Sequence, residues 1–230
     1  MAGNRRIVVT IDGPAGAGKS TVGRLLAERL GYLYMDTGAM YRAVAVLARE
    51  RSPENPVDEA ALTEICDALD LHMLSDSRGM RLVVNGRDLT EAIRKPEISA
   101  LASAVSARAV VRRRLAEIQR RLGGAGGIIA EGRDMGTVVF PEAEVKFFLD
   151  ARPTVRGERR HRELVAKGDK ATLLEVSEEL IARDRNDQGR ELAPLKAAAD
   201  AILVDSTERT VEEVVELMVR LIGERGVERP

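Results

Sequence analysis

Residues 7–26 read Ile-Val-Val-Thr-Ile-Asp-Gly-Pro-Ala-Gly-Ala-Gly-Lys-Ser-Thr-Val-Gly-Arg-Leu-Leu. The β-branched run 7–11 predicts a short buried strand, and the glycine-rich segment 13–18 predicts a loop. Apolar residues then recur with helical spacing at Val22, Leu25, Leu26 and Leu30. The stretch therefore predicts a strand, a loop and a helix in direct succession, which is where a phosphate-binding loop must lie.

The segment from Gly13 to Ser20 matches the P-loop pattern of a glycine, four variable residues, and Gly-Lys-Ser. Glycines lack Cβ atoms, so successive backbone N–H groups can converge on one anion, and the following helix adds its positive end. Lys19 can reach the β- and γ-phosphate oxygens, and the Ser20 hydroxyl can bind Mg²⁺. We therefore expect ATP or a similar triphosphate, with magnesium, to be bound by Gly13, Pro14, Ala15, Gly16, Ala17, Gly18, Lys19, Ser20 and Thr21.

Composition excludes several other classes of protein. The chain has 230 residues, and its 36 Lys+Arg nearly balance its 37 Asp+Glu, which fits neither a disordered tail nor a basic nucleic-acid-binding protein. The apolar run after Arg6 ends at Asp12, too early for a signal peptide, and no apolar stretch is long enough to span a membrane. A single cysteine, Cys66, fits a reducing compartment. We expect a cytoplasmic monomer that binds neither nucleic acid nor membrane.

Strands and helices alternate along most of the chain. Short apolar runs predict further strands at 32–35, 128–130, 145–149 and 201–204. Helices are expected at 36–50, 57–69, 97–106 and 108–122, at Pro153 and from about Thr210. This order predicts an α/β fold with a mostly parallel central sheet and helices on both faces, in three layers.

One segment departs from the alternation. Residues 71–74 and 80–84 read as short strands, and Asn85-Gly86 is a type I′ hairpin signal. We interpret residues 67–106 as a small β-containing insertion.

Arginine supplies all but six of the basic residues, and its positions are informative. Arg42, Arg133 and the group beginning at Arg156 follow predicted strands, where an open α/β sheet has its ligand crevice. A phosphate acceptor is already an anion and needs such cations, whereas a hydroxyl acceptor benefits from a general base. The two histidines, His72 and His161, are expected to be solvent-exposed or structural. The same holds for Arg113, Arg120 and Arg121, as solvated helix positions.

Taken together, these motifs resemble those of the nucleoside monophosphate kinases, most closely the bacterial cytidylate kinases. The residues that carry the resemblance are Ile11–Ser20, Met35–Arg42, Glu131–Pro141, Arg183-Asp184, Asp187, Arg190 and Ala193–Leu195. The resemblance spans nearly the whole chain. It implies a P-loop kinase core at 1–66 and 107–230, an acceptor-binding insertion at 67–106 and a mobile helical lid at 152–170.

The activity that the resemblance implies is transfer of the γ-phosphoryl group of ATP to CMP or dCMP, giving ADP and CDP or dCDP. Catalytic roles are then expected for Lys19, Arg133, Arg156, Arg160 and Arg190. Substrate-binding roles are expected for Thr37, Tyr41, Arg42, Ser103, Arg112, Arg133, Asp134, Arg183, Asp187 and Arg190. Among these, Arg42, Arg133 and Arg190 would hold the acceptor phosphate.

Cytosine recognition is assigned by the same resemblance. Asp134 would accept a hydrogen bond from the exocyclic amino group, and Ser103 and Arg112 would donate to the ring acceptors. Uracil presents an oxygen where cytosine presents that amino group, so discrimination against UMP is expected.

Mg²⁺ would be held by Ser20 and, indirectly, by Asp36, whose other interpretation as a helix N-cap does not exclude the metal role. Glu131 stands where many relatives carry Asp, which makes a water-mediated role in magnesium binding less certain there. Asp12 is expected to be structural.

Two alternatives remain open from the sequence. The first is a P-loop kinase for another small-molecule or nucleotide acceptor. The second is a non-catalytic nucleotide-binding switch, against which the chain lacks the Asn-Lys-x-Asp run that reads guanine.

Overall fold

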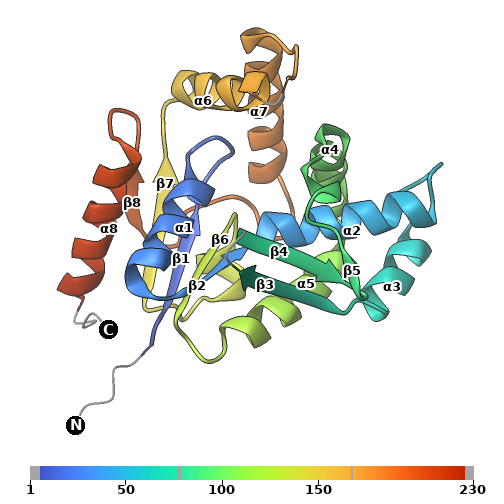
Figure 1. The fold of residues 1–230 in the computed structure, drawn as a ribbon, viewed down its shortest axis with the longest axis horizontal. Coiled ribbons are helices and arrows are strands. Elements are labelled where there is room, and N and C mark those ends of the chain that lie inside the picture. The colour runs from blue at the N-terminus through green and yellow to red at the C-terminus, as the bar shows by residue number, and fades with distance from the viewer. Residues whose placement is uncertain (1–5, 77–78, 167, 226–230) are drawn as a thin grey trace. The chain divides into compact units, whose positions relative to one another are not determined.

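The computed structural model describes residues 6–76, 79–166 and 168–225. The chain divides into two compact units, one of Met1–Met35 with Ala125–Pro230 and the other of Asp36–Gly124. Figure 1 shows a five-stranded sheet, ordered β2-β6-β1-β7-β8, and a separate three-stranded sheet, ordered β3-β4-β5.

The five-stranded sheet forms the centre of the first unit. Its strands are β1 (Val8–Asp12), β2 (Leu33–Asp36), β6 (Ile128–Gly132), β7 (Val145–Asp150) and β8 (Ile202–Asp205). Strand β1 pairs in parallel with β6 and β7, and β7 pairs in parallel with β8. Because parallel strands end at the same edge, Asp12 lies in register with Gly132 and Phe148. The segments that follow β1, β6 and β7 therefore begin next to one another.

The α-helices described in the first unit are α1 (Lys19–Leu30), α6 (Pro153–Ala166), α7 (Leu173–Gln188) and α8 (Val211–Glu224). Helices α1 and α8 pack against each other, and α6 packs against α7. The main core joins Ile11 of β1, Leu26 of α1, Phe147 of β7 and Met218 of α8. Its side chains are almost entirely aliphatic, as the low aromatic content requires. This core fixes the end of β1 from which the glycine-rich loop departs.

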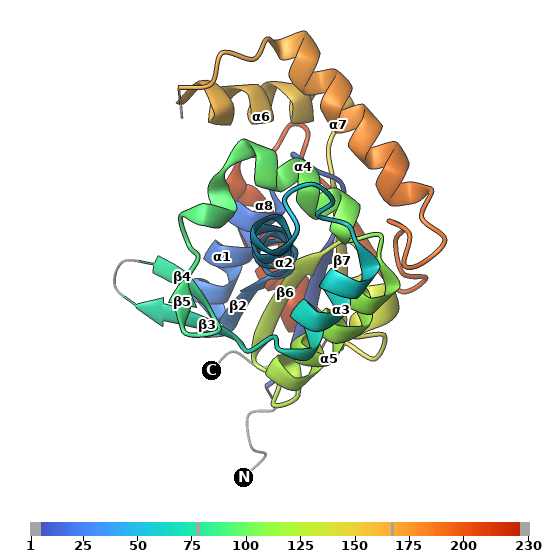
Figure 2. The ribbon, with the colours of Figure 1, turned by 90° about the vertical axis from the view of Figure 1, so that its right-hand side faces the viewer.

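The second unit combines helices with a small antiparallel sheet. Its elements are α2 (Thr37–Arg51), α3 (Glu59–Asp67), β3 (Leu71–Asp76), β4 (Gly79–Val84), β5 (Arg87–Asp88), a 3-10 turn (Ala92–Arg94), α4 (Pro96–Val105) and α5 (Ala109–Gly123). In Figure 2 helix α2 is seen end-on, and α3, α4 and α5 all pack against it. The helix is thus the central element of this unit.

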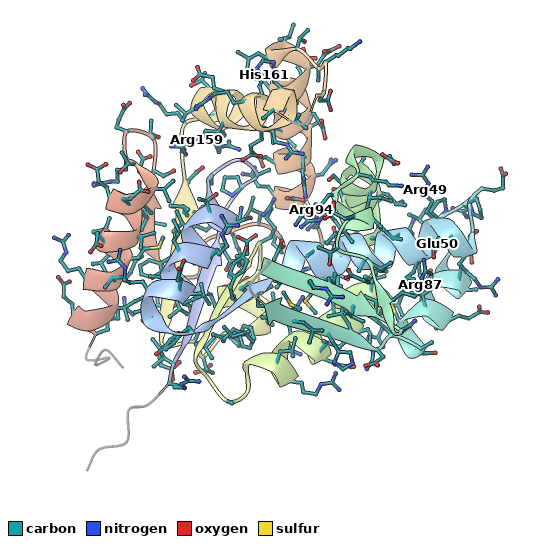
Figure 3. All side chains as sticks on the ribbon, in the orientation of Figure 1. Arg49, Glu50, Arg87, Arg94, Arg159 and His161 are labelled. Carbon is teal, nitrogen blue, oxygen red and sulfur yellow. The ribbon has the colours of Figure 1, made fainter. Side chains whose placement is uncertain are left out.

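A two-residue hairpin turn joins β4 to β5. Asn85 and Gly86 have φ values of 50° and 75°, as a type I′ turn requires. Helix α2 holds the strand that follows the turn. The Arg87 guanidinium donates two hydrogen bonds, of 2.8 and 3.0 Å, to the carboxylate of Glu50 on α2 (Figure 3). This contact lowers the pKa of Glu50. The φ values of Asn85 and Gly86 confirm the predicted hairpin turn.

The sequence predictions agree with most of these elements. The α/β class with a parallel central sheet flanked by helices is confirmed, and every predicted strand is present. Gly31 ends α1 in the left-handed conformation that glycine adopts most readily. The boundaries of the acceptor-binding insertion and of the lid stay predictions. Within the described residues, no helix combines the length and the apolar character that a membrane span requires.

Besides the 3-10 turn Ala92–Arg94, three elements of the described residues were not predicted from the sequence. Helix α7 is rich in charged residues, although the capping box of Thr172 and Glu175 marks its start. Strand β5 has only two residues. The third is a π-helical turn, Met135–Val139, which depends on a carboxylate supplied by a distant residue and so has no local signal.

Replacing Phe147 by Ala is expected to lower the free energy of unfolding by about 3–5 kcal/mol, because it leaves a cavity in a fully packed core. Phe147 is 1% exposed at the middle of the parallel sheet. The matched control is Phe148→Ala, on the same strand but only half-buried. Urea denaturation of both variants measures the difference. Equal losses at the two positions would contradict the described core.

Candidate active site

The phosphate-binding loop, residues 13–20, has a backbone that only glycine can adopt at three positions. Gly13, Gly16 and Gly18 have φ values of +148°, +75° and +92°. A Cβ atom at Gly13 would lie 2.0 Å from the Leu149 carbonyl oxygen, and one at Gly16 would lie 2.9 Å from that of Arg156. Helix α1 begins at Lys19, directly after the loop. The loop is therefore packed against the end of β7 and the first turn of α6, and its N–H groups adjoin the N-terminus of α1.

Lys19 is buried in the first turn of α1, with 6% of its surface exposed. Its Nζ donates a hydrogen bond of 2.7 Å to the Pro14 carbonyl oxygen. Burial, followed by the charge of Arg133, lowers the pKa of Lys19 to about 7, although Glu131 and Asp12 act in the opposite direction. An anion that binds beside Lys19 would stabilise its protonated form and raise its pKa again.

Ser20 and Glu131 place two oxygen atoms at the start of α1 and the end of β6. The Ser20 hydroxyl donates to Glu131 Oε1 at 2.9 Å, and Glu131 is 6% exposed. Hydroxyl and carboxylate oxygens fit Mg²⁺, which usually keeps several waters and takes phosphate oxygens as further ligands. The described part of the chain contains no cluster of three or more His, Cys, Asp or Glu side chains that could hold a metal ion.

Asp12 joins the end of β1 to the segment after β6. Its two carboxylate oxygens accept hydrogen bonds of 2.8 Å from the N–H groups of Met135 and Gly136. Burial raises the pKa of Asp12 to about 6, more than these hydrogen bonds lower it. The stability contributed by this group is therefore present below pH 3.8 and is lost as the pH rises through about 6. Asp12 holds Asp134 and its neighbours next to the phosphate-binding loop.

A buried carboxylate brings two of the predicted arginines together. Asp187, at the end of α7, is 1% exposed. Its Oδ2 accepts from Arg133 Nε at 2.8 Å, and its Oδ1 accepts from Arg190 Nη2. The side chains of Arg133 and Arg190 are 18% and 11% exposed. One carboxylate thus fixes two guanidinium groups, and the cluster of Arg133, Asp187 and Arg190 keeps a net positive charge suited to an anion.

The arginines of α6 differ in their surroundings. Arg156 is buried and pairs with Asp184, while Arg160 is half-buried and donates to Glu163 at 3.2 Å. The structure therefore does not bring Arg156 and Arg160 to one partner. Arg159 (Figure 3) donates to the backbone oxygen and the hydroxyl of Ser206, at 2.7 and 2.9 Å.

His161 lies on α6 as well and is half-buried (Figure 3). The other histidine, His72 on β3, is exposed, and its Nε2 lies 2.9 Å from Oδ1 of Asp70. Arg113, Arg120 and Arg121 are exposed on α5, as predicted. Arg183, one turn before Asp187 on α7, is half-buried.

In the second unit, Asp36 caps α2 and orients Arg42. Its Oδ1 accepts from the Ala39 N–H at 2.8 Å, and its Oδ2 accepts from Arg42 Nη2 at 3.0 Å. The N-cap interpretation of Asp36 is therefore confirmed, and its metal role stays a prediction. Thr37, also predicted to bind substrate, is the first residue of α2.

A second group in this unit links α2, α4 and α5. The guanidinium carbon of Arg112 lies 5.6 Å from the centre of the Tyr41 ring, within range of a cation–π interaction. Arg112 Nη1 also donates to the Ser106 carbonyl oxygen at 3.0 Å, and the Ser106 hydroxyl donates to the Ser103 carbonyl oxygen at 2.8 Å. The structure thus brings Tyr41 and Arg112 together and joins Arg112 to the end of α4, the helix on which Ser103 lies.

Sequence reasoning gave no separate role to Asp184. It continues the buried face of α7, on which Val176, Leu180 and Asp187 also lie. Carboxylates that continue an apolar stripe at helical spacing have to be buried and paired, which is the signal that could have identified Asp184.

Comparison with known proteins is consistent with this arrangement. The model of the cytidylate kinase family matches residues 9–224. The chain is 53% identical to a cytidylate kinase of Geobacter sp. (strain M21), over 95% of this chain and 94% of that protein. It is 48% identical to a cytidylate kinase of Carboxydothermus hydrogenoformans, over 95% of this chain and 98% of that protein.

Among solved structures, an uncharacterized protein from Eubacterium ventriosum has a similar fold. The TM-score is 0.51 at 10% sequence identity, and the match covers 95% of this chain and 99% of that one. At such low identity the likeness concerns the fold alone.

Binding of a nucleoside triphosphate is expected to take up protons above pH 7. The pKa of Lys19 is about 7 in the free protein, and adjacent phosphate charges raise it. The bound form then holds more protons than the free form, so affinity falls as the pH rises. Calorimetric titration with Mg-ATP at pH 8, in two buffers of different ionisation enthalpy, should report uptake of about one proton.

The control for this measurement is Lys19→Arg, because a guanidinium does not titrate in this range. It should bind with little proton uptake. Heats for the original protein that do not depend on the buffer, or that indicate proton release, would refute the role given to Lys19.

Proposed function

This chain belongs to the cytidylate kinase family, and we propose that it transfers the γ-phosphoryl group of ATP to CMP or dCMP, giving ADP and CDP or dCDP. It is a nucleoside monophosphate kinase. The observation that carries the proposal is the cluster of Arg133, Asp187 and Arg190. It lies in the same unit as the phosphate-binding loop, and Arg133 is near enough to Lys19 to lower its pKa. Two fixed guanidinium groups suit an acceptor that is itself a phosphate.

For the donor, residues 13–21 bind the triphosphate of ATP through backbone N–H groups. Lys19 leaves the Pro14 carbonyl oxygen and contacts the β- and γ-phosphate oxygens. The phosphate oxygens then stabilise the Lys19 charge and offset the free-energy cost of burying it. This stabilisation is greatest in the transition state, in which negative charge accumulates on these oxygens. Ser20 would hold Mg²⁺, with Glu131 and Asp36 as indirect partners, and the ion would neutralise phosphate charge.

For the acceptor, Arg42, Arg133 and Arg190 bind the phosphate of CMP. Arg133 and Arg190 are held in place by Asp187, and Arg42 is held by Asp36, so little side-chain entropy is lost when the phosphate binds. Fixed guanidinium groups also align the acceptor oxygen with the γ-phosphorus and screen the repulsion between two anions.

For the base and sugar, we assign Asp134, Ser103 and Arg112 to the cytosine edge. Asp134 is 3% exposed and directly precedes Met135 and Gly136, whose N–H groups bind Asp12, so the backbone that carries its carboxylate is held in place. Tyr41, Arg183 and Asp187 line the sugar and its surroundings, and Thr37 is assigned to the substrate site without a more specific role. An ionised Asp134 accepts from the cytosine amino group and is mismatched against uracil.

Segment 152–170 acts as a lid, from which Arg156 and Arg160 supply positive charge to the transferred group. Closure of the lid removes water, which would otherwise accept the phosphoryl group. We assign the reaction to pyrimidine nucleotide metabolism in the cytoplasm. The enzyme is proposed to act as a monomer without nucleic acid or membrane partners.

The experiment that tests the function is an acceptor panel. ADP release from Mg-ATP is measured with CMP, dCMP, UMP, AMP, GMP and a sugar alcohol as a hydroxyl acceptor. CMP or dCMP should give the highest kcat/KM. Lys19→Ala, folded by circular dichroism, should lose activity by orders of magnitude, which controls for contaminating kinases. Preference for a hydroxyl acceptor, or ATP binding without turnover of any acceptor, would establish one of the alternatives instead.

Asp134→Asn tests base recognition separately. The amide keeps one oxygen but replaces the other acceptor by a donor, which matches uracil better than cytosine. The ratio of kcat/KM for CMP to that for UMP should narrow by about tenfold or more. The exposed carboxylate change Glu142→Gln serves as the control and should leave the ratio unchanged. A variant at Asp134 with the original ratio would remove this residue from cytosine recognition.

A further inference from the structure

The phosphate-binding loop is held at Ala15 by two charged side chains from α6 and α7. Arg156 donates from Nη1 to the Ala15 carbonyl oxygen at 3.1 Å and from Nε to that of Ala151 at 3.0 Å. Asp184 accepts from the Ala15 N–H at 3.4 Å and forms an ion pair with Arg156. One buried ion pair therefore binds both backbone groups of a single loop residue.

Apolar packing reinforces these polar contacts. Ala15 belongs to a small core with Leu164 of α6 and with Val176 and Leu180 of α7. This core is distinct from the one beneath the central sheet. At the next residue, Gly16, a Cβ atom would lie 2.9 Å from the Arg156 carbonyl oxygen. The loop backbone at Ala15 and Gly16 thus lies directly against α6 and α7.

The buried ion pair of Arg156 and Asp184 could serve to join α6 to α7 or to shape the phosphate-binding loop, and its contacts distinguish the two roles. Arg156 and Asp184 are only 7% and 8% exposed, so their charges are largely desolvated. A buried ion pair often contributes little net stability compared with apolar residues, although removal of one partner is costly. If the pair served only to join α6 to α7, contacts between its two members would suffice. Both members instead bind Ala15 as well, which points to a role in the shape of the loop.

We propose that Asp184 and Arg156 form a clamp that sets the conformation of the phosphate-binding loop at Ala15. Asp184 is then a positioning residue for the donor nucleotide. The loop binds phosphate through the directions of its N–H groups, and small misalignments of such donors weaken binding strongly. Because Nε and Nη1 of Arg156 are engaged, any phosphate contact by this residue comes from Nη2. The inference rests on the proposed function, which makes ATP the donor.

Asp184→Asn tests the clamp, because it preserves size and removes the charge that holds Arg156. The KM for ATP, and the dissociation constant of Mg-ATP measured by calorimetry without acceptor, should rise about tenfold or more. The KM for CMP should stay within about twofold. The matched control is Glu179→Gln, an exposed carboxylate on the same helix, which should change neither value. A purely structural role would lower the melting temperature and the active fraction without raising the KM for ATP.

Arg156→Lys provides a second variant, which keeps the charge but cannot bridge Ala15 and Ala151. Since the two residues act as a unit, the double variant should weaken ATP binding no more than the stronger single variant. A folded Asp184→Asn protein with the original ATP affinity would overturn the proposal. Failure of both single variants to fold would also overturn it, because the pair would then support the helices and not the loop.

The proposed function stands or falls on a different result. If the unsubstituted enzyme did not phosphorylate CMP or dCMP, the proposed function would be refuted. The ATP affinity measured without acceptor would still decide whether the clamp exists.

Discussion

The buried ammonium group of Lys19 is the feature on which the rest of the site depends. The core beneath the parallel sheet fixes the end of β1, and the loop conformation then places Lys19 where water cannot solvate its charge. Burial and Arg133 lower its pKa more than Glu131 and Asp12 raise it. In a protein that binds triphosphate, this electrostatic cost is offset when the ligand arrives. The buried charge of Lys19 is therefore more stable when an anion is bound beside it than in the empty site.

Three buried carboxylates position the groups around this centre. Asp12 fixes the backbone beside Asp134, Asp187 holds Arg133 and Arg190, and Asp184 holds Arg156 against the loop. None of the three has to contact a substrate to matter, since each one orients the groups that do. Pre-orientation of this kind suits phosphoryl transfer, in which positioning and charge neutralisation supply most of the rate enhancement. The carboxylates thus position the arginines, and the arginines supply the positive charge that the reaction needs.

The sequence predicted the fold well where the signal was local. The strand 7–11, the loop and the helix after it follow from apolar spacing and glycine positions, and the hairpin follows from Asn85-Gly86. The prediction failed where a distant side chain stabilises the backbone, as Asp12 does for the π-helical turn at Met135–Val139. The same reason explains Asp184. Local pattern shows that a carboxylate lies on the apolar face of α7, whereas its partner Arg156 becomes evident only when the chain is folded.

The most direct test of the central claim is a crystal structure of the enzyme with Mg²⁺, a non-hydrolysable ATP analogue and CMP. We expect the β-phosphate to accept hydrogen bonds from loop N–H groups and from Lys19, whose Nζ has left the Pro14 carbonyl oxygen. The CMP phosphate should lie between Arg133 and Arg190. Triphosphate density away from the loop, with Lys19 still bound to Pro14, would contradict the account.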